Sequence, residues 1–317
     1  MTNTKHNLTY GSDVELALYH LPTAQMIPAT ELNTPETSDN RGELKKNGVL
    51  QGTYHRDNIL LEYQTLVCAN LPGVFQSSKV IRNYLGLKYK NQLKVSLCPK
   101  ALVEFTDPRM VTIPEAAELG CNPDYDAYTE QLAEPIHPAI MGLLRTGSGH
   151  IHIGNLPTLS FAQTCQFVRL LDIFVSVVHV VGYEAQVHFR GLARRNFYGQ
   201  AGRFRLKEYG IEYRTPSAQS PHLTNPTMAK HIQIGIEKAL CLTLRGVDSH
   251  EILSGSRVQD LINAPSVCEL VLEEMEREPG RGVPVREFLK IQEAWGADLA
   301  NARMAIGQYA AQHQNDV

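Results

Sequence analysis

Acidic and imidazole side chains recur at every second residue in several short, otherwise apolar segments. GSDVELAL places Asp13 and Glu15 two residues apart, and GHIHIG does the same with His150 and His152. Successive residues of a strand point to opposite sides of its sheet, so each pair would share one face. The segments DNILLEYQT, AQVHFR and GIEYRT alternate in the same way and group Asn58, Glu62 and Gln64, then Gln186, His188 and Arg190, then Glu212 and Arg214.

For any single strand, the simplest interpretation of such a face is contact with water. Solvent faces usually mix Ser, Thr, Lys and Glu, however, whereas these positions hold carboxylates, imidazoles and guanidiniums. If the strands are neighbours, the crowded carboxylates need a counter-charge. Carboxylates suit Mg²⁺ or Mn²⁺, and imidazole tolerates Mn²⁺. The pattern therefore predicts a divalent-metal site, which would take its remaining ligands from water and substrate phosphates.

The segment from Arg190 to Arg214 is strongly basic. It contains four glycines, two glutamates and seven basic residues, which are Arg190, Arg194, Arg195, Arg203, Arg205, Lys207 and Arg214. Such a loop can bring backbone N–H groups and bidentate guanidiniums against phosphate oxygens. An ordinary basic surface loop is the alternative. A metal face that ends in a phosphate-binding segment favours nucleotide-dependent phosphoryl chemistry.

Several common catalytic motifs do not occur in the sequence. There is no GxxxxGK[ST] loop, no GxGxxG after a strand and no GxSxG nucleophile elbow. Cys121, in GCNPDYDAY, could act as a nucleophile. A buried structural thiol is the simpler interpretation, because a reactive thiolate needs an activating neighbour.

The composition is that of an average globular protein. The chain has 317 residues, of which 43% are hydrophobic and 20% charged, enough for one large domain or two ordinary ones. Thirty basic and 33 acidic residues argue against nucleic-acid binding by bulk charge. The sequence has no long apolar stretch and no secretory leader, and its six cysteines form no CxxC pair, so we expect a cytoplasmic protein with reduced thiols and no membrane association.

Strands cluster early in the chain and helices late. We expect strands at 10–20, 57–67, 93–97, 102–105, 184–190 and 204–216, and helices at 71–91, 159–178, 224–246, 257–278 and 284–312. Residues 26–50, rich in Pro, Thr, Asn and charge, are expected to form an exposed connection or a lid. The pattern predicts an α+β fold with a largely antiparallel sheet and flanking helices. We assign a catalytic domain to 1–245, with C-terminal helices in 246–317 packed on it.

The ordered set GSDVE, RDNILLEYQ, GCNPDYDAY, GSGHIHIG, YGQAGRFR and YGIEYRTP resembles the phage-type amidoligases. These form the carboxylate–amine ligase type 2 family, within the glutamine synthetase and glutamate–cysteine ligase superfamily. The resemblance extends from about residue 10 to 245. It implies a glutamine synthetase-like catalytic fold and a bacteriophage-type, ATP-dependent ligase. Such an enzyme joins a carboxylate to an amine through an acyl phosphate and releases ADP and phosphate.

The resemblance also implies roles for residues at matching positions. It implies metal ligands at Asp13, Glu15, Glu62, His150 and Glu212. It implies ATP contacts at His152, Arg195, Arg203, Arg205 and Arg214, with Arg214 and Glu212 as the catalytic pair. We also expect Cys121, Asp124 and Arg190 to contact substrate. One departure is Asp13, where other superfamily branches have Glu, and its shorter side chain could shift a metal.

The implied cofactors are ATP and two Mg²⁺ or Mn²⁺ ions, and the implied partners are a small-molecule or peptide carboxylate and an amine. The sequence identifies neither substrate, and a homo-oligomer is compatible with the superfamily. Two other interpretations stay open. A guanidino kinase would use a related core to phosphorylate nitrogen, whereas a non-catalytic phage structural or interaction protein would keep only the fold. A degraded site would lack ligands, but none of the expected acids and histidines is missing.

Overall fold

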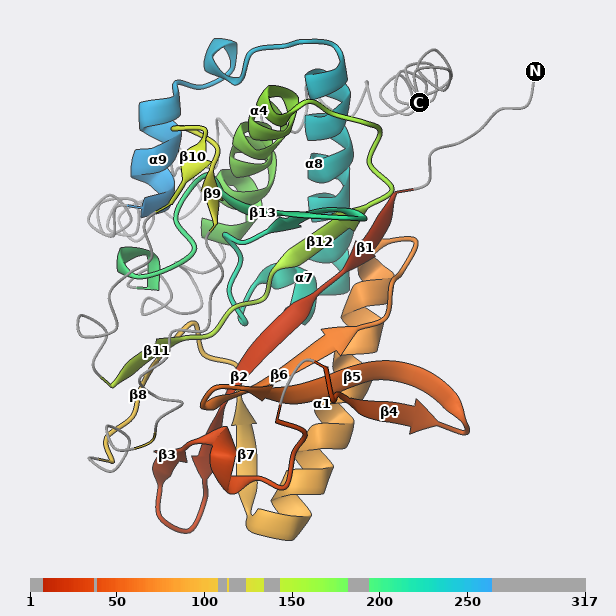
Figure 1. Ribbon diagram of the computed structural model, residues 1–317, viewed down its shortest axis with the longest axis vertical. Helices are drawn as coiled ribbons and strands as arrows, with labels where there is room; N and C mark the ends of the chain where they lie inside the picture. The colour runs from red at the N-terminus through yellow and green to blue at the C-terminus, as the bar shows by residue number, and fades with distance from the viewer. Residues whose placement is uncertain are drawn as a thin grey trace, which may run out of the picture.

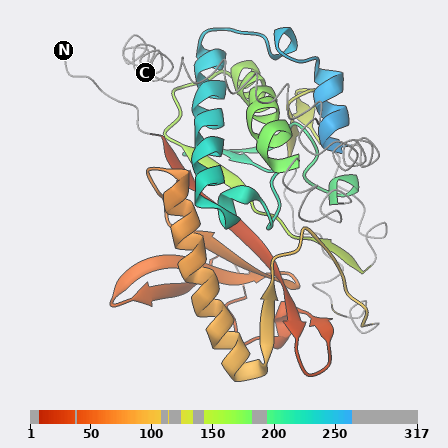
Figure 2. The same ribbon diagram turned by 180° about the vertical axis from the view of Figure 1, so that it is seen from behind.

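Strands β1 (Thr9–Gly11) and β2 (Asp13–His20) are separated by one residue but belong to different sheets. The computed structural model describes residues 8–36, 39–107, 113, 124–133, 143–181 and 194–263. Helices pack against sheets whose strands pair antiparallel throughout these ranges (Figures 1 and 2). The predicted α+β class with largely antiparallel sheets is therefore confirmed.

The first sheet has the strand order β1-β12-β14-β13-β9-β10. Its further strands are β12 (Ile151–Gly154), β14 (Gly210–Tyr213), β13 (Arg203–Lys207), β9 (Tyr125–Asp126) and β10 (Gln131–Leu132). Apolar residues of these strands, including Ile151, Ile153, Phe204 and Ile211, form one core with the helices that cover the sheet. The polar alternate residues therefore face away from this core.

The second sheet has the order β3-β2-β6-β5-β4, with one additional strand paired to β2. The strands besides β2 are β3 (Gln25–Ile27), β6 (Leu60–Thr65), β5 (Val49–Asp57), β4 (Gly42–Lys46) and the additional β7 (Val95–Cys98). Helix α1 (Leu71–Leu93) packs on the face that carries Val14, Leu16 and Leu61 (Figure 2). A separate two-stranded sheet joins β8 (Leu102–Glu104) to β11 (Leu144–Thr146).

Ser12 is the joint between the two large sheets. It is buried; its amide donates to Thr65 Oγ1 at 2.9 Å, and its hydroxyl donates to the His150 carbonyl at 2.7 Å. The His150 amide in turn donates to the Asp13 carbonyl at 3.2 Å. These bonds bring the start of β2 beside the start of β12, so the acidic and the imidazole segments meet where the sheets join.

The helices agree well with the sequence pattern. Asn70 caps α1 by accepting from the Gly73 amide at 2.8 Å. The predicted helix at 159–178 is α4 (Phe161–Leu171), which continues as a π-helix, η3 (Asp172–Val181). The helix predicted at 224–246 is α8 (Pro226–Leu244), after a short α7 (Pro221–Thr224).

The remaining elements are short. Single 3-10 turns are η1 (Ala29–Glu31), η4 (Arg194–Asn196) and η5 (Ser249–Glu251). Helix α9 (Gly255–Asn263) spans the start of the helix predicted at 257–278. The rest of that helix, the helix at 284–312 and the strand at 184–190 lie outside the described residues. None of the described helices combines the length and apolar character that a membrane span requires.

Residues 26–50, expected to form an exposed connection or a lid, contain regular strands. The segment contains most of β3, the turn η1, strand β4 and the beginning of β5. Strands β4 and β5 form a hairpin whose turn residues, Asn47 and Gly48, have φ of 53° and 79°. Asn-Gly is a strong hairpin signal because both residues tolerate positive φ. The charged, short strands on either side hid the pattern, and a lid role for the segment stays a prediction.

Candidate functional site

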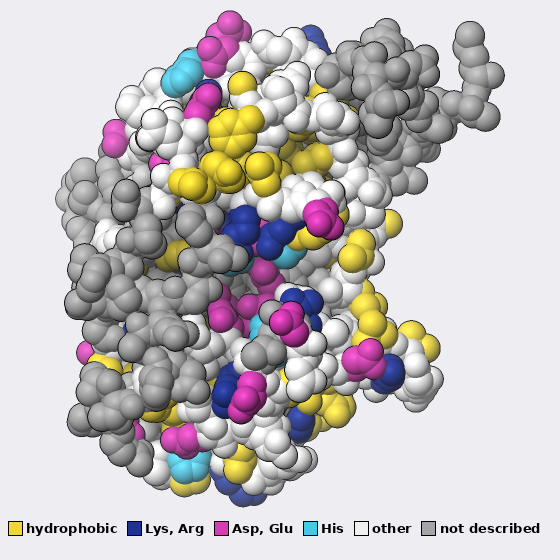
Figure 3. All heavy atoms as spheres, viewed as in Figure 1, with side chains coloured by type: hydrophobic (Ala, Val, Ile, Leu, Met, Phe, Trp, Pro, Cys, Tyr) yellow, Lys and Arg dark blue, Asp and Glu magenta, His cyan; other side chains and the backbone are white. Residues whose placement is uncertain are grey.

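Two groups of potential metal ligands lie where the sheets meet. Asp13, His152 and Glu212 offer ligand atoms that are all within 4.8 Å of one another. The second group, Glu15, Asp57 and Glu62, meets the same distance criterion. Asp13 and Glu15 alternate on β2, so one strand contributes a carboxylate to each group. Figure 3 shows acidic, basic and imidazole side chains gathered in a hollow near the centre of the molecule.

Strand register explains how these residues come together. Glu15 lies opposite Glu62 in the second sheet, and His152 lies opposite Glu212 in the first. Asp57 ends β5 just before a tight turn in which Asn58 has φ of 51°. The structure thus brings the acids and histidines that the sequence pattern grouped together to the junction of the two sheets. They are Asp13, Glu15, Glu62, His150, His152 and Glu212.

Each imidazole faces the first group with one nitrogen and a tyrosine hydroxyl with the other. His150 Nδ1 lies 3.0 Å from Asp13 Oδ1 and 3.1 Å from Glu212 Oε1, and its Nε2 lies 3.4 Å from the Tyr198 hydroxyl. His152 Nε2 lies 3.1 Å from Asp13 Oδ2, and its Nδ1 contacts the Tyr209 hydroxyl. Imidazole ligands of metals are commonly oriented in this way by a partner on the second nitrogen.

Charges within the first group compensate one another. Burial alone would raise the pKa of Asp13, but His152 and His150 hold it well below its usual value. Burial and Asp13 likewise raise the pKa of Glu212, but the net effect, with His150 and His152 lowering it, is a pKa of about 2. Burial lowers the pKa of His150, but the charge of Asp13 and hydrogen bonds to Asp13 and Glu212 together raise it to about 8. Protonated imidazole thus supplies the positive charge that a cation would supply.

The second group is acidic and uncompensated. Burial, followed by the charges of Asp13, Asp57 and Glu15, raises the pKa of Glu62 well above its usual value. Burial and Glu15 raise the pKa of Asp57 to about 7. The nearest imidazole, His55, has Nε2 3.9 Å from Glu62 Oε1, but burial lowers its pKa to about 4, so it is neutral. Three carboxylates without a cation are a donor set that fits Mg²⁺ or Mn²⁺.

A wall of basic side chains borders the first group. Arg203, Arg205 and Lys207 alternate along β13 and share one face. Lys207 Nζ lies 2.8 Å from Glu212 Oε2, and Arg214 Nη1 lies 3.2 Å from Glu212 Oε1. The structure therefore brings Arg205, Lys207 and Arg214, three of the residues of the predicted basic segment, beside the first group.

Asp124 is an acidic neighbour of these basic side chains. Its Oδ1 lies 3.0 Å from Arg214 Nη1 and 3.6 Å from Arg205 Nη2. Arg195, by contrast, is 2% exposed and donates to the Gly199 carbonyl at 2.7 Å. A phosphate contact by Arg195 and a substrate contact by Asp124 stay predictions. Cys121 and Arg190 lie outside the described residues.

Sequence reasoning missed two residues of the site. Asp57 lies in the second ligand group. The sequence could have indicated it only by its position in RDNILLEYQ, directly before Asn58, where the alternation with Glu62 and Gln64 begins. The Tyr198 ring lies 5.1 Å from the guanidinium carbons of both Arg194 and Arg214, and its hydroxyl faces His150. Tyr198 precedes Gly199 in an irregular loop, so no periodicity could have indicated it.

Residues 144–246 match the family model described as phage phiEco32-like COOH-NH2 ligase type 2. This match covers about a third of the chain and supports the predicted family, whose name describes a ligase that joins a carboxyl and an amino group. The matched range includes β12, β13 and β14, with His150, Glu212 and Arg214, but not β2 and β6. None of the curated proteins compared with the chain matches it.

Proposed function

We propose that the protein is an ATP-dependent carboxylate–amine ligase that works through an acyl phosphate. The observation that carries the proposal is the pair of ligand groups that share β2, together with Arg205 and Arg214 beside Glu212. One group is acid-only. The other combines acids with imidazole and adjoins guanidiniums that match phosphate oxygens. The family match to residues 144–246 supports the ligase reaction.

Two divalent ions fit the donor sets. One would be held by Asp13, Glu212 and an imidazole, and the other by Glu15, Asp57 and Glu62. Asp13 Oδ1 and Glu212 Oε2 are buried and form ion pairs with His150 Nδ1 and Lys207 Nζ, at 3.0 and 2.8 Å, so a cation at this site would take the place of a positive charge that the side chains now supply. When bound, the ions would screen the charge of the ATP phosphates and polarise the γ-phosphoryl group.

The arginine side chains beside Glu212 would assist phosphoryl transfer. Arg214 and Arg205, both tied to Glu212, would hold the oxygens of the transferring phosphoryl group. A carboxylate oxygen of the substrate attacks the γ-phosphorus, the bond to ADP breaks, and an acyl phosphate forms. Phosphate is a good leaving group, whereas the oxide of a free carboxylate is a poor one. The neutral amine then attacks the acyl carbon, the C–O bond to phosphate breaks, and the released phosphate or a nearby base accepts the proton. Water must be excluded, because acyl phosphates hydrolyse.

Hydroxylamine trapping tests the proposal. Purified protein with ATP and Mg²⁺ is screened for ADP release against pairs of carboxylic acids and amines. With the acid alone, hydroxylamine should intercept the acyl phosphate as a hydroxamate. A guanidino kinase would instead give an acid-labile phosphoramidate and no hydroxamate. That product, or the absence of hydroxamate from any acid in a broad panel, would contradict the proposal.

A further inference from the structure

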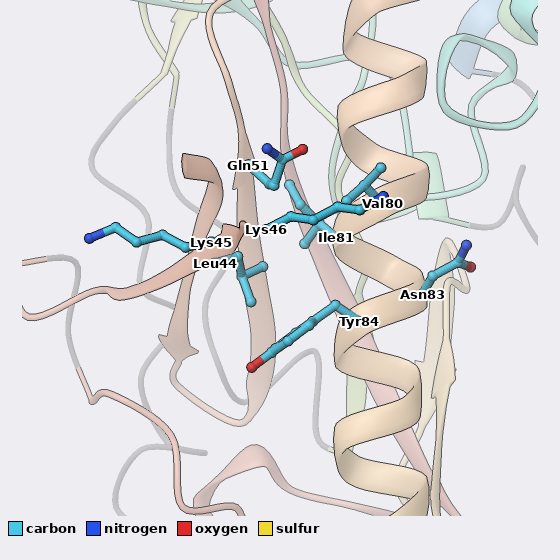
Figure 4. Close-up of a pocket in the computed structure, with 8 residues that line it drawn as sticks. All are labelled: Leu44, Lys45, Lys46, Gln51, Val80, Ile81, Asn83 and Tyr84. Atoms are coloured by element: carbon cyan, nitrogen blue, oxygen red, sulfur yellow. The ribbon is translucent and has the colours of Figure 1, made fainter. Parts of the chain in front are cut away.

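A groove lies between the β4–β5 hairpin and helix α1, away from the ligand groups. Its volume is about 270 Å³, and its lining residues are Leu44, Lys45, Lys46, Gln51, Val80, Ile81, Asn83 and Tyr84 (Figure 4). Apolar residues of α1 and the second sheet form one core beneath it, including Ile81 and Leu44. Asp13, Glu15 and Glu62 alternate with residues of that core, so the groove and the proposed active site lie on opposite faces of the sheet.

The floor of the groove is apolar and firmly positioned. Ile81 and Leu44 are buried, and at Gly52 a Cβ atom would lie 2.4 Å from Ile81 Cδ1, so the hairpin touches the helix there. Tyr84, which lines the groove, is 50% exposed, and the same two elements carry the exposed apolar residues Val49 on β5 and Leu87 on α1, at 62% and 63%. Exposed apolar residues grouped around a recess are typical of a surface that contacts another molecule.

The helix side of the groove carries charge of one sign. Helix α1 contains Lys79, Arg82, Lys88 and Lys90 and no acidic residue. On the hairpin, Lys46 extends toward Val80, whereas Lys45 points away from the helix and pairs with Glu43 (Figure 4). Lys79 lies one helical turn before Asn83. The groove therefore presents apolar side chains between lysines in a chain whose net charge is -3.

We propose that this groove binds an acidic polypeptide segment that carries apolar side chains. The apolar residues of the segment would cover Leu44, Val80 and Tyr84, and its carboxylates would pair with Lys46 and Lys79. The volume is below the range of about 300–1,000 Å³ that is usual for small-molecule sites, and the lining has few converging polar groups. A bilayer could contact the edges but not the recessed floor, and the lining contains no arginine for phosphate recognition. This interaction does not depend on the proposed ligase reaction.

Selection from a random displayed peptide library tests the proposal. Peptides selected on the full chain should be rich in Asp or Glu next to Leu, Phe or Ile. Their affinity, measured by fluorescence anisotropy, should fall about tenfold with Lys46→Glu and with Tyr84→Ser. Lys90→Glu makes the same charge change on α1 outside the lining and should alter affinity less than twofold. Circular dichroism melting of each variant checks that the fold is kept.

Vesicles and DNA test whether the groove binds a membrane or a nucleic acid instead of a polypeptide. Vesicles of phosphatidylglycerol and phosphatidylcholine, and single-stranded DNA, are tested with the same variants. Failure to enrich acidic peptides, equal losses with Lys46→Glu and Lys90→Glu, or a Lys46-dependent preference for vesicles or DNA would each overturn the proposal. Selected peptides should leave Mg²⁺–ADP binding unchanged, because the groove lies across the sheet from the ligand groups.

Discussion

The two ligand groups are neighbours on β2 but balance their negative charge in opposite ways. In the group of Asp13, His152 and Glu212, imidazoles and basic side chains hold the pKa values of the carboxyls low. In the group of Glu15, Asp57 and Glu62, the imidazole that the described residues place nearby is His55, whose pKa burial lowers, and the pKa values of Asp57 and Glu62 are raised. The first group is thus an ion-pair network without metal, whereas in the second the raised pKa values favour protonated carboxyls that a cation would have to displace.

The largest effect is expected at Glu212, which contacts His150, Lys207 and Arg214. Glu212→Gln and Glu212→Ala should lower ADP formation by on the order of 10³-fold, because both a ligand and the anchor of the basic wall are lost. The fold should persist at a lower melting temperature, because either substitution leaves the buried His150 and Arg214 without this partner. Steady-state kinetics and thermal melting measure both. Normal turnover or an unfolded variant would make Glu212 a structural residue.

Substitutions in the second group should remove one bound metal ion and leave the ion of the first group in place. Asp57→Asn and Glu62→Gln should reduce activity by about 10²-fold and reduce the metal stoichiometry from two to one in calorimetry. Without metal, both variants should melt at the same or a higher temperature, because they relieve repulsion between carboxylates. A matched control is Glu43→Gln, a half-exposed acid of the same sheet. Two bound ions in the Asp57→Asn protein would contradict the assignment of this group.

Metal binding should release protons, and mainly from the second group. Asp57 has a pKa of about 7 and His150 of about 8, so both are partly or wholly protonated near pH 7 without metal, and burial raises the pKa of Glu62 as well. Ligands must be deprotonated, so Mg²⁺ affinity should fall as pH decreases from 8 to 6, by about tenfold per unit for each proton released. Calorimetry in buffers of different ionisation enthalpy counts the protons. A pH-independent affinity would contradict the raised pKa values.

The smallest effects are expected at Tyr198, whose hydroxyl faces His150 and whose ring lies beside Arg194 and Arg214. Tyr198→Phe keeps the ring beside Arg214 but removes the hydroxyl facing His150, and should weaken Mg²⁺ binding a few-fold with kcat nearly unchanged. Tyr198→Leu removes the ring and should lower kcat about tenfold. Tyr84→Phe, on α1, is the control. Equal effects of the two Tyr198 substitutions on kcat would show that the ring does not position Arg214.

Alternation along strands made most of this site predictable. A period of two places Asp13 with Glu15 and His150 with His152 whatever the tertiary structure, so the faces followed from sequence alone. Asp57 and Tyr198 could not be found in this way. Asp57 depends on the tight turn that reverses the chain after β5, and Tyr198 on a loop folded over two arginines. The β4–β5 hairpin was missed because Lys45, Lys46 and Asn47 resemble a solvated connection.

The single-residue step from β1 to β2 at Ser12 has a consequence for the order of assembly. The second ligand group needs only Glu15, Asp57 and Glu62, which one local sheet brings together. The first group must wait for Glu212, supplied by the last strand of the other sheet, to dock beside Asp13. Contacts between distant parts of a chain form slowly, because the intervening loop has to close first. During synthesis, therefore, an acid-only half-site would exist before the imidazoles and arginines arrive, and nucleotide binding would report the final docking of the two sheets.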